Sequence, residues 1–189
     1  GKIRNEPFLY YSLELYTWDY PGYHKYFSSR RIKYAEERYH RQSQATIIQD
    51  ERRARHLLRD NKIENAQVLL LPVSLLGPVR RKKSDFLQNK FSFNSDERVI
   101  LQIGQIAPLR FGFELAQIAQ NFPPYLKMVF HGWGKKNSLE EILKADKKNK
   151  VFLSLERQTW KQLYTVVTSA HIGLVLYKSE TMNDYLTVF

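Results

Sequence analysis

The sequence predicts an α/β protein of two units, each with parallel strands flanked by helices. Short continuous apolar runs alternate with amphipathic stretches of helical spacing along the 189 residues. Strands that are apolar throughout are typical of parallel sheets, because helices cover both of their faces. A basic, polar stretch, residues 77–97, separates two such alternating regions. We therefore expect a first unit over residues 1–76, a linker over 77–97 and a second unit over 98–189.

In the first unit, three apolar runs predict strands, and two segments between them predict helices. The expected elements are strands 8–13, 45–48 and 68–71 and helices 29–41 and 51–60. Ser29 and Asp50 stand where N-caps are expected, since their side-chain oxygens can accept from free N–H groups. In the first helix we expect Ile32, Ala35 and Tyr39 to form the apolar face, because they recur at helical spacing.

The second unit alternates in the same way. The expected elements are strands 99–103, 126–130, 151–154 and 172–177 and helices 113–120, 138–145 and 159–169. Two capping boxes support the helix starts, Ser138 with Glu141 and Thr159 with Gln162, because each hydroxyl has a reciprocal acceptor three residues on. Before this unit, Gly77-Pro78 and a run of four basic residues mark the linker.

Composition narrows the classes of partner and site. The chain has no cysteine, which excludes disulfides and cysteine-ligated zinc, and no apolar run long enough to predict a membrane-spanning helix. The net charge of +11 makes nucleic acid, anionic lipid and nucleotide phosphates candidate partners, beside a merely solvated basic surface. No P-loop, D-x-D motif, G-x-S-x-G elbow or metal-binding histidine spacing occurs, so we expect no metal and no cofactor.

The loops after the strands of the second unit are where we expect a ligand, because parallel α/β sheets bind ligands beyond the carboxyl ends of their strands. These are loops 104–112, 131–137, 154–159 and 177–184. In the first loop, Gly104 lets the backbone approach a ligand, and Arg110 stands just before a helix N-terminus. A cation beside free N–H groups favours an anion. An ordinary turn with a solvated arginine is the alternative.

The other three loops supply further candidates. Gly132 and Gly134 flank Trp133, which suggests close backbone approach with the indole as a surface cover or a ligand wall, although the full G-x-G-x-x-G pattern is absent. The remaining candidates are Glu156 in the third loop and Lys178, Glu180 and Asn183 in the fourth. For the fourth loop, an ordinary solvated loop is the alternative.

Together these segments resemble the retaining glycosyltransferases of family four, the "group 1" set with two Rossmann-like domains (GT-B fold). In the second unit, the resemblance is carried by Val99–Arg110, Val129–Gly134 and Trp160–Tyr177. In the first unit, it is carried by Tyr10–Leu15, Thr46–Arg53 and Leu70–Val73. The order and spacing of these motifs carry more weight than any one of them. Both units would be incomplete versions of the family's domains.

The resemblance implies a glycosyltransferase that moves a sugar, with retention, from a nucleotide-sugar donor to a glycan, lipid or small-molecule acceptor. Residues 1–76 would end the acceptor-side domain, and residues 98–189 would begin the donor domain. The family's motifs place Glu180 as the catalytic carboxylate. They place the donor-binding residues at Gly104, Gln105, Arg110, Gly132, Trp133, Glu156, Lys178 and Asn183. The resemblance also implies a cytoplasmic protein that has no nucleic-acid partner. Peripheral binding to the inner face of the membrane is an alternative that the resemblance allows.

Several positions depart from the family's pattern. Gln105 stands where the family has Arg, Arg110 where it has Lys, and Phe111 where it has Gly. His171 replaces an Asp, and Val188 stands at the second Glu of the E-x7-E motif. Because that Glu holds the donor ribose in the family, we expect residues 1–189 alone to have little or no transferase activity.

Two other classes of function remain open. A dinucleotide-binding α/β protein would share the fold, but the strand after the first helix of the second unit ends in His-Gly rather than an acidic, ribose-binding residue. A non-catalytic module would bind RNA or a membrane surface through a basic, aromatic helix. Its patch would be Arg30, Arg31, Lys33, Arg38 and Arg41 with Tyr34 and Tyr39, and a solvated helix face is the simpler interpretation.

Overall fold

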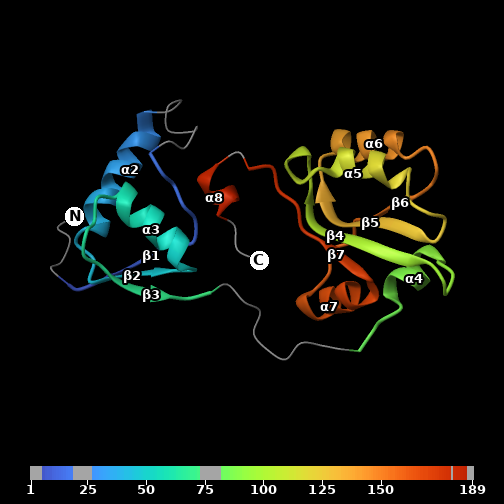
Figure 1. The fold of residues 1–189 in the computed structure, drawn as a ribbon, viewed down its shortest axis with the longest axis horizontal. Coiled ribbons are helices and arrows are strands. Elements are labelled where there is room, and N and C mark those ends of the chain that lie inside the picture. Colours follow the sequence, from blue (N-terminus) through green and yellow to red (C-terminus); the bar gives the residue numbers. More distant parts are fainter. Residues whose placement is uncertain (1–5, 19–26, 73–81, 180, 187–189) are drawn as a thin grey trace. The chain divides into compact units, whose positions relative to one another are not determined.

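The computed structural model describes residues 6–18, 27–72, 82–179 and 181–186. The chain divides into two compact units, Gly1–Leu76 with Ser179–Phe189, and Gly77–Lys178. Each unit has a parallel sheet with helices packed against it, which confirms the expected fold class (Figure 1). None of the helices in the described ranges has the length and apolarity needed to cross a membrane.

The first unit is a three-stranded sheet of order β1-β2-β3. Its elements are β1 (Leu9–Tyr11), α2 (Phe27–His40), β2 (Ala45–Ile48), α3 (Glu51–Asp60), β3 (Gln67–Leu70) and α8 (Met182–Tyr185). Helices α2 and α3 lie on the same side of the sheet (Figure 1). Asp50 caps α3 as expected, since its Oδ1 accepts from the N–H groups of Arg52 at 2.8 Å and Arg53 at 3.0 Å.

The rotation of α2 differs from the expected one. Ile32 is 66% exposed and Tyr39 is 38% exposed, whereas Lys33, Glu37 and His40 are buried. Polar groups on neighbouring elements explain this inversion, because the Lys33 ammonium meets Asn61 Oδ1 at 2.7 Å just beyond α3. Ser29, expected as the N-cap, lies inside the helix, which begins two residues earlier.

The second unit is a four-stranded parallel sheet of order β6-β5-β4-β7. Its elements are α4 (Phe86–Phe91), β4 (Arg98–Ile106), the 3-10 turn η1 (Pro108–Arg110), α5 (Gly112–Ala119), β5 (Leu126–Gly134), α6 (Lys136–Ala145), β6 (Val151–Ser154), α7 (Trp160–Ser169) and β7 (Ile172–Leu174). Helices α5 and α6 cover one face of this sheet, and α4 and α7 cover the other (Figure 1). Each face has its own apolar core, one around Phe130 and one around Val129.

The unit boundaries differ from the expected ones in two places. Part of the expected linker folds as α4, because Leu87 is fully buried against Val99 and Val166. The segment expected to continue the donor domain, Ser179–Phe189, is grouped with the first unit instead. Leu186 there packs against the core of the first unit, and its carbonyl accepts from Arg53 Nη1 at 3.1 Å.

Local differences also change where the predicted site residues lie. Strands β4 and β5 pair over nine residues each, from Arg98 opposite Leu126 to Ile106 opposite Gly134. The starts of the expected loops 104–112 and 131–137 are therefore the last residues of β4 and β5, because the two strands pair up to Ile106 and Gly134. Helix α6 begins before the expected capping box at Ser138 and has no side-chain cap. The capping box of Thr159 at the start of α7 is confirmed.

Candidate functional site

The carboxyl ends of β4 and β7 bring two predicted cations to the same edge of the second unit's sheet. Strand β4 leads through η1 into α5, and the chain after β7 returns to η1, where the Lys178 N–H donates to the Leu109 carbonyl at 2.9 Å. This backbone contact fixes the Lys178 segment beside the turn that carries Arg110. The two predicted loops therefore form one site, which we call the cationic edge (Arg110, Glu114, Tyr177 and Lys178).

Arg110 is held by a ring and by its own backbone. The guanidinium carbon lies 3.9 Å from the centre of the Tyr177 ring, and Gln102 Nε2 donates to the Arg110 carbonyl at 2.9 Å. Among the residues that the structure describes, no carboxylate pairs with this guanidinium. Its N–H donors therefore remain available to a ligand while stacking restricts the side chain.

The N-terminus of α5 follows Arg110 directly. Its N-cap residue, Phe111, has a left-handed backbone with φ of 56° and no side-chain oxygen, so the N-cap side chain accepts from none of the first N–H groups of α5. Helix N-termini carry a partial positive charge. A cation and an uncapped helix start at one sheet edge make a site for an anion such as a diphosphate.

Lys178, the second cation, is partly neutralised. Its ammonium lies 3.2 Å from Glu114 Oε1 on α5 and 5.3 Å from the centre of the Phe111 ring. The carboxylate of Glu114 accepts a hydrogen bond from the backbone N–H of Glu114, and this is the main cause that lowers the pKa of Glu114. The contacts with Lys178 lower this pKa further. Glu114 is therefore ionised at neutral pH, and Lys178 contributes less field to a ligand than Arg110 does.

The predicted glycines serve the backbone of the sheet. Gly132 has φ of +148°, and a Cβ there would lie 2.8 Å from the carbonyl carbon of Gly104 and closer still to its oxygen. Gly104 has φ of +116°, a backbone conformation that residues other than glycine rarely adopt. A Cβ at Gly104 would meet nothing within 4 Å. Beside them, Gln105 pairs with Trp133, whose side chain is 67% exposed. Strand contact thus explains Gly132, and a positive φ explains Gly104, without a ligand.

Glu156 belongs to a second cluster, at the ends of β5 and β6. It pairs with Lys90 of α4 and accepts from the Ser154 hydroxyl at 3.1 Å. That hydroxyl is also 2.9 Å from Nδ1 of His131. We call these four residues the histidine relay (Lys90, Glu156, Ser154 and His131).

The remaining two predicted site residues are Glu180 and Asn183, and both stay predictions. Glu180, the expected catalytic residue, lies outside the described residues. Asn183 lies in α8, which the structure groups with the first unit, because neighbours of Asn183 in α8 pack on that unit's core. A role of Asn183 in donor binding stays a prediction.

Several polar residues of the two clusters could not be singled out from the sequence. They are Lys90, Glu114, His131, Ser154 and Tyr177. For His131, Ser154 and Tyr177, the local signal was their place in loops expected to bind a ligand, whereas Lys90 and Glu114 lie in helices α4 and α5. Within the described part of the chain, no group of three potential ligands could hold a metal ion.

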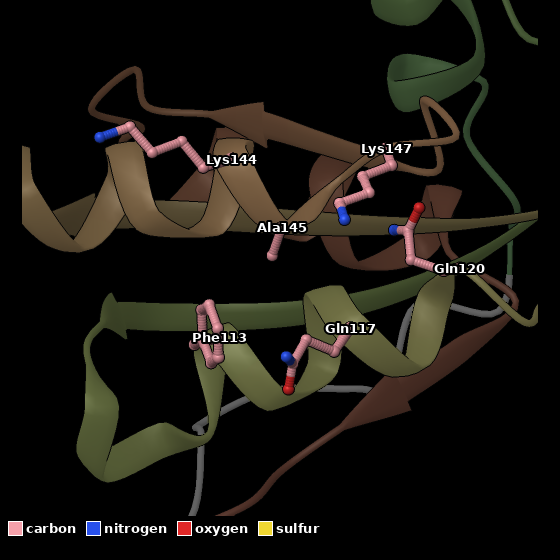
Figure 2. A pocket seen from close by; sticks show the side chains of 6 residues that line it. All are labelled: Phe113, Gln117, Gln120, Lys144, Ala145 and Lys147. Atoms are coloured by element: carbon pink, nitrogen blue, oxygen red, sulfur yellow. The ribbon is translucent and has the colours of Figure 1, made fainter.

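A surface groove of about 430 Å³ lies elsewhere, between α5 and α6 (Figure 2). It is lined by Phe113, Gln117, Gln120, Lys144, Ala145 and Lys147. Gln120 is already occupied there, since its Nε2 donates to Asp146 Oδ1 at 3.0 Å. None of the predicted site residues lines this groove, so it is distinct from the sheet edge.

Comparison with known proteins gives structural matches only. No family model and no curated protein sequence matches the chain. A trehalose-6-phosphate protein from E. coli, bound to UDP-2-fluoro glucose, matches with a TM-score of 0.64 and 11% identity over 92% of this chain and 47% of its own. Anabaena HepE, in complex with UDP and glucose, matches with a TM-score of 0.63 and 12% identity over 91% of this chain and 46% of its own.

WaaG, a glycosyltransferase of lipopolysaccharide biosynthesis, matches with a TM-score of 0.62 and 13% identity over 89% of this chain and 50% of its own. These matches show that the fold is of the GT-B type. The chain spans about half the length of the structures it matches.

Proposed function

We propose that the chain is part of a glycosyltransferase that binds a nucleotide-sugar donor at the cationic edge of its second unit. The observation that carries this proposal is the guanidinium of Arg110, which pairs with no carboxylate among the described residues and lies next to the start of α5, where the N-cap residue provides no side-chain cap. A cation beside a helix N-terminus favours an additional anion, because the carboxylate of Glu114 in the first turn of α5 is already paired with Lys178. The diphosphate of a nucleotide sugar is such an anion, and two of the proteins named above, the E. coli trehalose-6-phosphate protein and HepE, have structures with a UDP sugar or UDP bound.

The proposed chemistry relies on charge stabilisation rather than on a protein nucleophile. As the bond from the sugar to the diphosphate breaks, negative charge grows on the departing phosphate oxygens. Arg110 and the first N–H groups of α5 would stabilise that charge, with a weaker contribution from Lys178, so that no metal is required. The proposal keeps Glu180 as the carboxylate that faces the donor sugar, retention as the stereochemical outcome, and a glycan or lipid-linked acceptor.

Binding of nucleoside diphosphates tests the proposal. We expect UDP or GDP to bind the chain in calorimetry, and Arg110→Ala to weaken that binding by about tenfold to a hundredfold, because a charge-assisted hydrogen bond contributes roughly 1.5–3 kcal/mol. Arg98→Ala is the matched control, since Arg98 is an exposed arginine at the opposite end of the same strand. Its loss should leave the affinity unchanged.

Two results would count against the proposal. Equal affinities of the wild type and Arg110→Ala would remove Arg110 from the site. Tighter binding of NAD or of an RNA oligomer than of any nucleoside diphosphate would favour a dinucleotide-binding protein or a basic binding module instead.

A further inference from the structure

The histidine relay connects α4 to the carboxyl ends of β6 and β5. The ammonium of Lys90 contacts Glu156 Oε1, the Ser154 hydroxyl lies 3.1 Å from Glu156 Oε2, and His131 Nδ1 lies 2.9 Å from the same hydroxyl. His131 and Ser154 are buried, with 3% and 0% of their surface exposed. The relay lies on the face of the sheet that α4 and α7 cover. His131 is two residues after Val129 of that core in the same strand, so both side chains point to the same face.

The order of donors along the relay fixes the tautomer of the histidine. The hydrogen bond from Lys90 is the main cause that holds the pKa of Glu156 below its usual value, so Glu156 is an ionised carboxylate that can only accept. The Ser154 hydroxyl therefore donates its single proton to Glu156. The bond between Ser154 and His131 must then be donated by the ring, which places the proton on Nδ1.

The ring is neutral at ordinary pH. Burial is the main cause that lowers the pKa of His131, with a smaller raising effect from Glu156 and a smaller lowering effect from Lys90. A neutral imidazole that carries its proton on Nδ1 has a lone pair on Nε2. That atom is consequently a hydrogen-bond acceptor of fixed direction.

This acceptor is unused by the protein. His131 Nε2 forms no hydrogen bond with any residue in the described ranges, and it is not one of the fully buried atoms without a partner. This buried ring therefore keeps an unused acceptor near the carboxyl end of β5, the strand beside β4, whose end leads to Arg110. Because a lone pair repels phosphate oxygens, the complementary ligand group is an N–H or O–H.

We infer that His131 accepts a hydrogen bond through Nε2 from the nucleoside of the donor, and that Ser154, Glu156 and Lys90 are positioning residues that hold its tautomer. The inference rests on the proposed function, which assigns the diphosphate to Arg110 and the start of α5. The nucleoside is the part of UDP that offers donors, as ribose hydroxyls and as the base N3–H. The relay would then select nucleotides that present a donor at this point.

A pair of His131 variants separates the acceptor from the relay. Asn places an amide where Nδ1 stands, so His131→Asn keeps the donor to Ser154 and loses the acceptor, whereas His131→Gln places an amide near Nε2. We expect UDP affinity in calorimetry to fall by about three- to tenfold in His131→Asn and by less in His131→Gln, as for one neutral hydrogen bond. Uridine diphosphate lacking the 2′-hydroxyl, and UDP methylated at N3, distinguish a ribose donor from a base donor. Circular dichroism confirms that both variants fold.

Nitrogen-15 NMR of the His131 ring measures which ring nitrogen carries the proton. If His131 had only a structural role, its Nε2 resonance would not change when UDP is added. We expect Nδ1 to be protonated and Nε2 unprotonated in the wild type, the Nε2 resonance to shift on addition of UDP, and Ser154→Ala to mix the tautomers. A proton on Nε2 in the free wild type would overturn the inference.

The calorimetric outcomes keep this inference separate from the proposed function. If UDP binds the wild type and His131→Asn equally, the inference is wrong and the proposed function stands. If neither UDP nor GDP binds the wild type, the proposed function is wrong and this inference is lost with it. A loss of affinity in His131→Asn that His131→Gln partly restores supports both.

Discussion

The ammonium of Lys33, at the centre of α2, lies 2.6 Å from Oδ2 of Asp60 at the end of α3, and the Lys33 side chain has no exposed surface. The same ammonium lies 3.2 Å from Glu36 Oε2 and 2.7 Å from Asn61 Oδ1. A buried ammonium is unfavourable unless such partners surround it. This polar network therefore sets the rotation of α2 about its axis, in place of apolar packing.

Removal of the Lys33 charge should strongly destabilise the first unit. Lys33→Met leaves two carboxylates without their cation, and breaking a buried pair from one side costs about 3–5 kcal/mol of unfolding free energy. Urea denaturation followed by Trp18 fluorescence measures this, with Trp133 and Trp160 replaced by Phe, because Trp18 is then the one tryptophan of the chain. Lys62→Met is the control, since the Lys62 side chain is 70% exposed in its pair with Glu37 and should change stability by less than about 1 kcal/mol.

The pH dependence of the same unit should follow His40. Burial is the main cause that lowers the pKa of His40 from 6.5 to about 4, with Glu36 raising it and Lys33 lowering it further. The unfolded chain therefore binds a proton at a higher pH than the folded chain does. The contribution of His40 to the unfolding free energy is fully present above pH 6.5. As the pH falls toward 4, up to about 3 kcal/mol of that free energy is lost.

Denaturation at a series of pH values checks this expectation. His40→Gln should flatten the stability profile between pH 6.5 and 4, whereas His56→Gln, on the half-buried side of α3, should preserve it. A profile that keeps its slope in His40→Gln would assign the dependence to another group.

A methyl group at Gly132 should disrupt the second unit. Gly132→Ala combines a positive φ with a collision against the Gly104 backbone, so we expect a loss of about 3 kcal/mol or more in unfolding free energy. Gly173→Ala in β7 of the same sheet is the control, because a Cβ there would meet nothing within 4 Å. That change should be neutral or stabilise by about 0.5 kcal/mol. Similar effects of the two substitutions would show that the strand contact is not the reason for Gly132.

The ring of Tyr177 should assist Arg110 through its face rather than its hydroxyl. Tyr177→Leu removes the cation–π contact, which contributes about 0.5–1 kcal/mol at a partly exposed site, so UDP should bind about two- to fivefold more weakly. Tyr177→Phe keeps the face and should bind UDP as the wild type does. Equal weakening by Phe and Leu would instead implicate the hydroxyl.

Features determined by neighbouring residues in the sequence could be predicted. The cap of α3 at Asp50 and the capping box at Thr159 require only residues within one helical turn, and both are confirmed. The buried side of α2 could not be predicted, because it depends on Asp60 and Asn61, which lie more than twenty residues away. The missed helix α4 has the same cause, since the burial of Leu87 depends on strands and helices that follow it.

The candidate site shows the same division. Arg110 before a helix start was visible in the sequence, and the structure confirms its place at the start of α5. Its stacking on Tyr177 was not visible, because the order β5-β4-β7 decides which loops meet. The histidine relay likewise depends on the register that sets His131 opposite Ser154.

Strand β3 has a consequence for the behaviour of the protein in solution. Among the described strands it has a neighbour on one side only, and Leu69, Leu70 and Leu71 are 42%, 46% and 52% exposed. An apolar edge strand with free N–H and C=O groups is a template on which another chain can add a strand, and no charged residue interrupts it here. The tendency of this protein to aggregate should therefore rise with concentration and begin at this edge, ahead of any general unfolding.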